Sequence, residues 1–411
     1  VREKYRPRAA KATSAHRLRP VLNEMLGELG ESHFGVIPGS RELEAAALQK
    51  GESQGEGEGR GEKADVDQAI EENEIEDERV AAGDYSGIHL RVHGEQVIIS
   101  RVDAGSPAAK VGLRAGQTVK KIGDLEVPVF LKKAAETASK SFSKDFFVLK
   151  VLGELTGGPE EGDWQSISVA NPLRPRKVTE HTYRPISYPG AMSMAAANMP
   201  SMPIRYEERR LPLPEGDVLY LGFNMFVPEV MTKLRESMKN RGEDIVGLIV
   251  DVRGNPGGLG LMANGLAGLL TDEQFSLGQM NMRAGEFNFV AFPQRGAYLG
   301  PMVILVDSMS ASTSEIFAAG MQEAGRARVI GRRTMGAALP SFIRELPNGD
   351  RLQHAIADLT TAKGRRVEGR GVIPNKTVPL RPKKLFQGAD PDLDKAMKWL
   401  QRQIERRASS Q

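Results

Sequence analysis

Apolar residues recur along the chain with a period that changes from one segment to the next. Between residues 18 and 29, leucine, valine and methionine return every three or four positions, which predicts an amphipathic helix that ends at Gly30. From Gly83 onward, apolar and polar residues alternate in short runs such as 86–92 and 96–102. Because alternation with a period of two predicts half-buried strands, this part of the chain should be mostly β.

The second half of the chain contains apolar runs that are followed by helical patterns. The strands expected there are 216–223, 245–251 and 302–307, and the helices are 228–240, 260–271 and 313–324. Strands that alternate with helices predict an α/β core over 201–385. A last helix should run from about 391 to 405, since Asp390 suits an N-cap and Pro391 a first turn.

Differences in amino-acid composition mark the boundaries between segments of the chain. Glycine, glutamate, glutamine and serine dominate 51–64, and acidic residues are frequent in 65–79, so this stretch has too little apolar surface to fold alone. The predicted organisation is an N-terminal helical segment (1–50), an acidic and Gly-rich linker (51–82), a small β domain (83–155), a connecting segment (156–200), the core (201–385) and a C-terminal helix (386–411).

Composition and charge argue against several classes of function. With 411 residues, 40% hydrophobic and 27% charged, the chain should form two or three globular domains. No apolar run approaches the roughly 18 residues of a membrane span, and a net charge of +3 gives no reason to expect nucleic-acid binding. There is no cysteine and the six histidines lack metal-ligand spacing, so no metal or other cofactor is expected. The chain begins at Val1, which suggests a mature form without its targeting segment.

The stretch from Ser310 to Ile316, SASTSEI, joins a buried apolar run to a helical pattern. A small-residue turn at this place lifts one hydroxyl out of the core and sets it beside the free N–H groups of a helix N-terminus. A serine nucleophile needs this arrangement, because the oxyanion that it generates must meet hydrogen-bond donors. The same residues also suit ordinary helix capping, with Ser312 or Thr313 as N-cap and Glu315 in the first turn.

A second turn, DVRGNPGG at 251–258, follows another apolar run. Its glycines allow the backbone to approach a ligand and to aim N–H groups at it, or they form a tight strand–helix turn. It lacks the Gly-Lys-Ser/Thr of a P-loop and the spacing of GxGxxG, so it matches neither of these phosphate-binding motifs.

Together these turns resemble the peptidase family of the tail-specific (C-terminal processing) proteases, the tricorn core and the interphotoreceptor retinoid-binding protein. The family carries D-x-R-x-N-x-G-G and S-A-S-x-S-E-I, and its nucleophile matches Ser312. The resemblance implies a crotonase/Clp-like β-β-α spiral core, and an oxyanion hole made by the N–H of Thr313 with that of Gly257 or Gly258. It also favours an extracytoplasmic location, periplasmic or secreted, and leaves a homo-oligomer open.

The lysine that serves as general base in the tail-specific branch is missing, because Ala337 occupies its position. The tricorn branch instead uses a histidine in E-L-G-x-S-H and a glutamate in V-E-x-x-G-V-x-P, and this chain matches both segments. The resemblance therefore implies His33 as base, Glu368 as its orienting partner and Ser32 as a hydroxyl that holds either of them. Two other residues remain as alternative bases: Lys363 and His354.

Residues 83–155 resemble a PDZ domain. The segment GSPA at 105–108 is followed by the pattern A-G-L-x-x-G-D, with Val111 for the usual alanine and Gln117 for the usual aspartate. PDZ domains take up a peptide as an added strand and seat its C-terminal carboxylate in a backbone nest. The nest would consist of Tyr85, Ser86, Gly87 and Ile88. A structural spacer with a degenerate groove is the alternative.

The sequence thus predicts a serine endopeptidase that cleaves flexible or unfolded proteins through a Ser-His-Glu triad. Its partners would be protein or peptide substrates, captured by their C-termini in the PDZ-like domain. Two other functions remain open, namely a non-catalytic ligand-binding member of the same fold and a scaffold that works through the PDZ groove alone.

Overall fold

The computed structural model describes residues 1–37, 84–137, 144–157, 164–187, 191–194 and 199–409. The expected linker at 51–82 lies outside the described residues. Helices and strands alternate in the second half of the chain, so the predicted mixed α/β class is confirmed.

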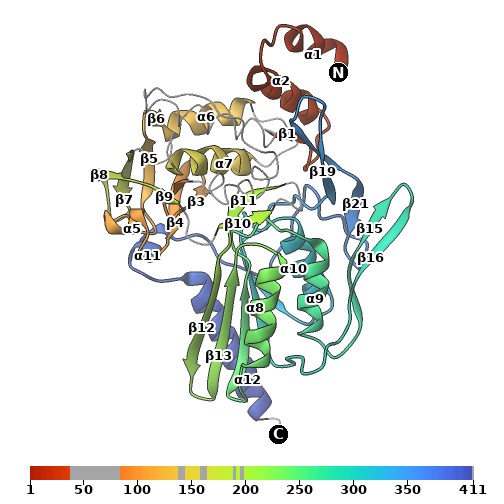
Figure 1. The fold of residues 1–411 in the computed structure, drawn as a ribbon. Coiled ribbons are helices and arrows are strands. Elements are labelled where there is room, and N and C mark those ends of the chain that lie inside the picture. Colours follow the sequence, from red (N-terminus) through yellow and green to blue (C-terminus); the bar gives the residue numbers. More distant parts are fainter. Residues whose placement is uncertain (38–83, 138–143, 158–163, 188–190, 195–198, 410–411) are drawn as a thin grey trace, which may run out of the picture.

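A six-stranded sheet forms the centre of the core (Figure 1). Its order is β12 (Tyr206–Leu213), β13 (Gly216–Phe223), β14 (Ile245–Asp251), β17 (Met302–Val306), β18 (Arg328–Gly331) and β22 (Lys376–Thr377). β12 is antiparallel to β13, and the neighbours from β13 to β22 are parallel. The carboxyl ends of β14 and β17 therefore lie side by side, and the two turns singled out in the sequence follow them.

Helices cover both faces of this sheet, which is why its central strands are continuous apolar runs. On one face lie α8 (Pro228–Lys239), α9 (Gly260–Gly268) and α10 (Thr313–Glu323), whose apolar side chains share a buried cluster with the strands. On the other face lies α12 (Pro391–Ala408), whose Leu400 belongs to a second cluster. The predicted cap is confirmed, since the Asp390 side chain accepts the first N–H groups of α12 at 3.1 and 3.2 Å.

A second domain lies beside the core (Figure 1). Its sheet has the order β3 (Ile88–His93), β4 (Gln96–Val102), β5 (Thr118–Ile122), β7 (Gln165–Asn171) and β8 (Arg174–Tyr183), with β6 (Leu125–Glu126) paired to β5. Three helices complete it, α5 (Pro107–Lys110), α6 (Val127–Thr137) and α7 (Lys144–Gly157). Residues 165–183 were expected in the connecting segment, but they extend this sheet because Ile167 and Val169 alternate into the buried cluster of the domain.

The beginning of the chain is joined to the core. It forms α1 (Arg2–Ala9), α2 (Ala15–Gly27) and β1 (Gly35–Ile37), and β1 pairs with β20 (Arg351–Ala355), which also pairs with β19 (Ser341–Glu345). Arg19 of α2 forms a buried ion pair with Asp350 at 2.8 Å, across a separation of 331 residues. The N-terminal segment is therefore part of the folded core.

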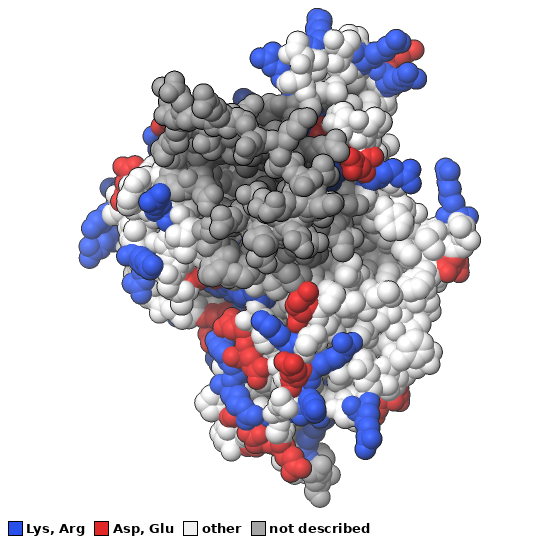
Figure 2. Space-filling model, viewed as in Figure 1, with Lys and Arg blue, Asp and Glu red and all other residues white. Residues whose placement is uncertain are grey.

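Smaller elements complete the described structure. They are the sheet of β16 (Gly285–Ala291), β15 (Phe275–Met282) and β21 (Ala357–Thr360), the pairs β10 (Ala191–Met194) with β11 (Met199–Pro203) and β2 (Asp84–Tyr85) with β9 (Ile186–Ser187), and the helix α11 (Pro382–Phe386). Figure 2 shows basic and acidic side chains interspersed over the region of β12, β13 and α8, so this part of the surface carries no field of a single sign. Among the described helices, none combines the length and apolarity needed to cross a membrane.

Candidate active site

Ser312 lies between β17 and the first residue of α10. Its backbone has φ 53° and ψ −120°, a left-handed φ that is strained for a residue with a Cβ. Hydrogen bonds hold the neighbouring residues in place. The Ser310 hydroxyl donates to the Val252 carbonyl at 2.7 Å, and the Ser314 hydroxyl donates to the Asn255 carbonyl at 2.9 Å. The turn after β14 thus fixes the turn after β17, and a strained strand–helix turn of this kind can hold a nucleophile away from the core.

Glu315 serves both as a helix cap and as a clamp. Its carboxylate accepts the N–H of Ser312 at 3.1 Å, as the capping interpretation predicted. It also accepts the N–H groups of Gly336 and Ala337, at 2.8 and 3.0 Å, and the hydroxyl of Thr334. Burial raises the pKa of Glu315 to about 7, against the opposite effect of these donors. Sequence analysis noticed only the cap, so the anchoring of the 334–337 segment is new.

The Gly-rich turn lies directly against Ser312. Gly257 has φ 112°, and a Cβ at this position would come within 2.7 Å of Ser312 Cβ and 3.0 Å of Thr313 N. The N–H of Gly257 donates to the Asn255 side chain at 2.9 Å, so this donor is occupied. Thr313 is the first residue of α10, and its N–H has no acceptor within its own helix. The candidate oxyanion donors are therefore the N–H groups of Thr313 and Gly258.

His33 lies between α2 and β1 at a backbone φ of 60°. Its Nδ1 is 2.6 Å from the hydroxyl oxygen of Ser32. The imidazole is partly buried, and this burial lowers its pKa to about 4. At neutral pH the ring is uncharged, as a general base must be. If Nδ1–H donates to the Ser32 hydroxyl oxygen, Nε2 is left as the proton acceptor.

Glu368 joins the N-terminal segment to the nucleophile turn. It is buried, and its two carboxylate oxygens accept the N–H groups of Ser32 and Ala338, each at 2.8 Å. The carbonyl of the adjacent Ala337 accepts the N–H of Ser312 at 2.8 Å. Among the hydrogen bonds of the described residues, none runs from Glu368 to the imidazole itself. Glu368 instead accepts the main-chain N–H of Ser32, and the Ser32 hydroxyl, which the sequence had predicted to hold either Glu368 or the imidazole, contacts the imidazole.

The two alternative bases lie elsewhere. His354 is on β20, where it faces Phe342 across the strand pair, and its Nδ1 is 3.4 Å from the carbonyl of Ala355. Lys363 is exposed, and its N–H donates to Glu323 near the end of α10. Neither shares a hydrogen bond with the Ser312 turn within the described structure, whereas the segments of Ser32 and Glu368 are linked to that turn as set out above.

A buried ion pair connects the second domain to this region. Arg91 of β3 donates to Asp307 at 2.7 Å, and both side chains are almost fully enclosed. The other oxygen of Asp307 accepts the N–H groups of Gly254 and Met309, at 2.9 and 3.0 Å. Burial alone would raise the pKa of Asp307, but Arg91 and Arg332 lower it to about 2. Sequence analysis missed this pair, because Arg91 looks like any polar residue of an alternating strand.

The aspartate and arginine of the D-x-R motif play a structural part. Arg253 binds Asp251 of its own motif and also Asp390 and Asp392 at the start of α12, at 2.6 to 3.1 Å. Asp251 also accepts the Tyr220 hydroxyl at 2.7 Å. These contacts anchor the Gly-rich turn to the opposite face of the sheet and leave its glycines facing Ser312.

The expected carboxylate nest is a compact turn. The Tyr85 hydroxyl donates to Asp103 at 2.7 Å, and the Ile88 N–H donates to the Ser86 hydroxyl at 3.2 Å. Gly87 has φ 80°, and a Cβ on it would collide with the side chain of Ser106. β3, which follows this turn, is an edge strand of its sheet, and α7 packs beside it. An edge strand beside a helix is the arrangement that accepts an added peptide strand.

Residues 217–378, which contain both motif turns and the Glu368 segment, match the model of peptidase family S41. The core of this chain is a peptidase family S41 domain. The resemblance to the C-terminal processing proteases is therefore confirmed. No group of three or more His, Cys, Asp or Glu side chains in the described part of the chain is arranged to hold a metal ion.

Two curated relatives are similar to part of this chain. The carboxyl-terminal-processing protease of Picosynechococcus sp. is 30% identical over 166 residues, which are 40% of this chain and 39% of that protein. The carboxy-terminal processing protease CtpA of Bacillus subtilis is 27% identical over 159 residues, 39% of this chain and 34% of that protein. The chain thus spans well under two thirds of these two relatives.

Solved structures extend the similarity of fold to nearly the whole chain. The photosystem II D1 C-terminal processing protease covers 97% of this chain and 90% of its own, with a TM-score of 0.55 and 19% identity. The match to mature CPAF spans 98% of this chain and 91% of the CPAF chain, with a TM-score of 0.62 and 13% identity. At such identities the likeness concerns the fold alone.

Proposed function

We propose that this protein is a serine endopeptidase that cleaves flexible or unfolded chains, with Ser312 as nucleophile and His33 as general base. One observation carries the proposal. A series of hydrogen bonds, joined covalently at Ala337–Ala338 and within Ser32, leads from the Ser312 backbone through Glu368 to the imidazole. The buried carboxylate fixes the main chain of Ser32, and the Ser32 hydroxyl contacts the uncharged imidazole, so a carboxylate, a base and a nucleophile of the triad type belong to one connected unit.

The reaction would be acyl transfer followed by hydrolysis. The Ser312 oxygen attacks the peptide carbonyl while His33 Nε2 takes the hydroxyl proton. The N–H groups of Thr313 and Gly258 receive the oxyanion, and each such donor typically contributes roughly 3–4 kcal/mol to the transition state. His33 then protonates the leaving amine, and a water molecule cleaves the acyl-enzyme in the reverse sequence. Ser32 and Glu368 act as positioning residues that keep the ring proton on Nδ1.

The second domain would capture the substrate in the manner of a PDZ domain. An extended C-terminus would add to the edge of β3 next to α7, with its carboxylate at the Tyr85–Ile88 turn. The Ile88 N–H already has a hydroxyl partner in Ser86, so capture requires that this bond yield to the ligand. We also propose that the strands and helices of the core are arranged in the crotonase/Clp-like β-β-α spiral that the family resemblance implies.

The decisive test is active-site labelling by a fluorophosphonate, combined with turnover of an unfolded protein such as reduced casein. The wild type should be labelled and should degrade casein, whereas Ser312→Ala should do neither and His33→Ala should lose nearly all turnover. Lys363→Ala and His354→Asn are matched controls that should retain activity. If the wild type is neither labelled nor active while the fold is intact, the protein is a non-catalytic member. Loss of turnover in Lys363→Ala with His33→Ala still active would replace the histidine by a lysine base.

A further inference from the structure

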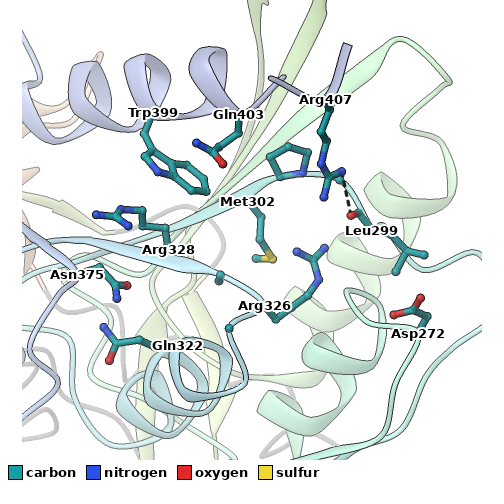
Figure 3. A pocket seen from close by; sticks show the side chains of 14 residues that line it. Asp272, Leu299, Met302, Gln322, Arg326, Arg328, Asn375, Trp399, Gln403 and Arg407 are labelled. Carbon is teal, nitrogen blue, oxygen red and sulfur yellow. Dashed lines mark hydrogen bonds between the residues drawn. The ribbon is translucent and has the colours of Figure 1, made fainter. Parts of the chain in front are cut away.

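A pocket with a volume of about 520 Å³ lies at the amino ends of β17 and β18, at the opposite edge of the sheet from the nucleophile turn. Arg328, the first residue of β18, lines it together with the side of α12 that carries Trp399, Gln403 and Arg407 (Figure 3). These three residues of α12 recur every four positions and so share one side of the helix. The volume suits a small molecule, and neither motif turn contributes to the lining.

The charges that line this pocket do not balance. Three guanidinium groups, those of Arg326, Arg328 and Arg407, face a single carboxylate, that of Asp272. None of the ion pairs found among the described residues includes any of these four side chains, whereas Arg253 and Arg332 on the same domain are both paired with aspartates. The pocket therefore carries an excess of positive charge that the protein itself leaves without a counter-ion.

The arginines are held in place by uncharged partners. Arg326 donates to the carbonyls of Leu270 and Tyr298, and Arg407 donates to that of Leu299 at 3.4 Å. Figure 3 shows Arg326 and Arg407 extending toward the same space from opposite walls. Hydrogen bonds to carbonyl groups hold a guanidinium in position, but they do not neutralise its positive charge. Burial lowers the pKa of Arg326 and the charge of Arg407 lowers it further, although Tyr298 and Asp272 act in the opposite sense.

Arg328 lies over the indole of Trp399, with 5.7 Å between the guanidinium carbon and the ring centroid. Stacking keeps the plane of the guanidinium fixed while its N–H edge remains available. Three side-chain amides, those of Gln322, Asn375 and Gln403, complete the polar lining. A rigid guanidinium fork and neutral amide donors are the groups that bind a phosphate oxygen edge.

We propose that this pocket binds a small anion of the phosphate class that carries two or more negative charges, held by Arg326, Arg328 and Arg407. Such a ligand would supply the missing counter-charge, and its oxygens would match the planar donors of the arginines. A small ligand fits better than a macromolecule, because the arginines line a concave pocket at the junction of α10, β18 and α12. The site would be separate from the peptidase centre.

Inorganic pyrophosphate is a suitable probe, measured on the full chain by isothermal titration calorimetry and by the shift of the thermal unfolding midpoint. Pyrophosphate should bind the wild type and raise its Tm, since a ligand that binds only the folded state stabilises it. The double variant Arg328→Gln/Arg407→Gln should bind at least about tenfold more weakly, as expected when charged hydrogen bonds are lost. Arg402→Gln is the matched control, because Arg402 lies on α12, is exposed and does not line the pocket.

Several results would overturn the proposal. These are no heat and no Tm shift with the wild type, undiminished binding in the double variant, or an equal loss in Arg402→Gln. A Tm shift that sodium chloride reproduces at the same ionic strength would indicate general screening instead of a site. Binding to phosphatidylglycerol vesicles without any binding of free pyrophosphate would identify a lipid surface as the ligand and would rule out the small anion.

Discussion

The pKa of His33 gives the sharpest prediction. From the ordinary value of a histidine side chain, the sequence alone places the acid limb of the peptidase activity at pH 6–7. In the structure, burial lowers the pKa of His33 to about 4. The neutral, proton-accepting ring should therefore persist down to mildly acidic pH. We expect kcat/KM for a short fluorogenic peptide to fall only as the pH drops through about 4, because this ratio reports the ionisation of the free enzyme.

The same shift links His33 to stability. The pKa in the folded state lies below the unfolded value of 6.5, so the unfolded state binds more protons at intermediate pH. The stabilisation that the depressed pKa of His33 contributes is fully present above pH 6.5 and is lost as the pH falls through about 4. The difference amounts to about 3 kcal/mol at about 1.4 kcal/mol per pKa unit. Urea unfolding at pH 7 and pH 4 should show that the free-energy gap between the wild type and His33→Asn changes by roughly this amount.

Titration by NMR of protein with ¹⁵N-labelled histidine measures the pKa directly. The resonance that disappears in His33→Asn identifies the imidazole, and His354→Asn controls for the loss of another histidine. A titration of His33 at pH 6–7, together with an acid limb of activity in the same range, would refute the argument from burial. It would also mean that water reaches the ring in the resting protein.

Three further variants test the surroundings of the site. Gly257→Ala should lower kcat at least tenfold in the peptide assay while the thermal midpoint falls only modestly, since its Cβ would press on Ser312 Cβ at a strained φ. Glu315→Gln should flatten the pH dependence of urea stability. The raised folded pKa of about 7 gives the wild type stability that is present below pH 4.5 and is lost as the pH rises through 7. Arg91→Leu should destabilise the protein by about 3–5 kcal/mol in the same assay, because Asp307 is left buried without its partner.

For each of these three predictions, one outcome would contradict the reasoning. Full activity of Gly257→Ala would mean that the Gly-rich turn can move away from the nucleophile. An unchanged pH profile in Glu315→Gln would show that this carboxyl titrates normally. If Arg91→Leu is as stable as the wild type, the ion pair does not hold the two domains together. Adding Asp307→Asn to Arg91→Leu should recover part of the lost stability, since it removes the unpaired charge.

Local sequence was sufficient to find the turns of the site. The SASTSEI and DVRGNPGG segments combine a buried strand, small residues and a helix start within about a dozen positions, and the fold places them together because their strands are neighbours in one parallel sheet. The C-terminal helix was predicted with its cap for the same reason. Asp390, Pro391 and the apolar spacing after them all act within one helix.

Long-range pairing could not be predicted in the same way. Arg91 meets Asp307 across 216 residues, and nothing in an alternating strand tells which polar residue will be buried against another domain. Strands β7 and β8 were assigned to a connection because residues 156–200 are rich in Pro, Gly, Met and Ala, and helices α6 and α7 separate these strands in sequence from the rest of their sheet. The depressed pKa of His33 likewise depends on burial by packing, which no motif encodes.

The order of the candidate site residues along the chain has a consequence for synthesis. Translation produces Ser32 and His33 before Ser312, which follows 279 residues after His33, and Glu368 comes later still. In the proposed mechanism, a chain that is still being made holds the base but neither the nucleophile nor the carboxylate that fixes the base. In the proposed mechanism, a nascent chain therefore has no complete catalytic site until Glu368 has been translated and its segment has packed against those of Ser32 and Ser312.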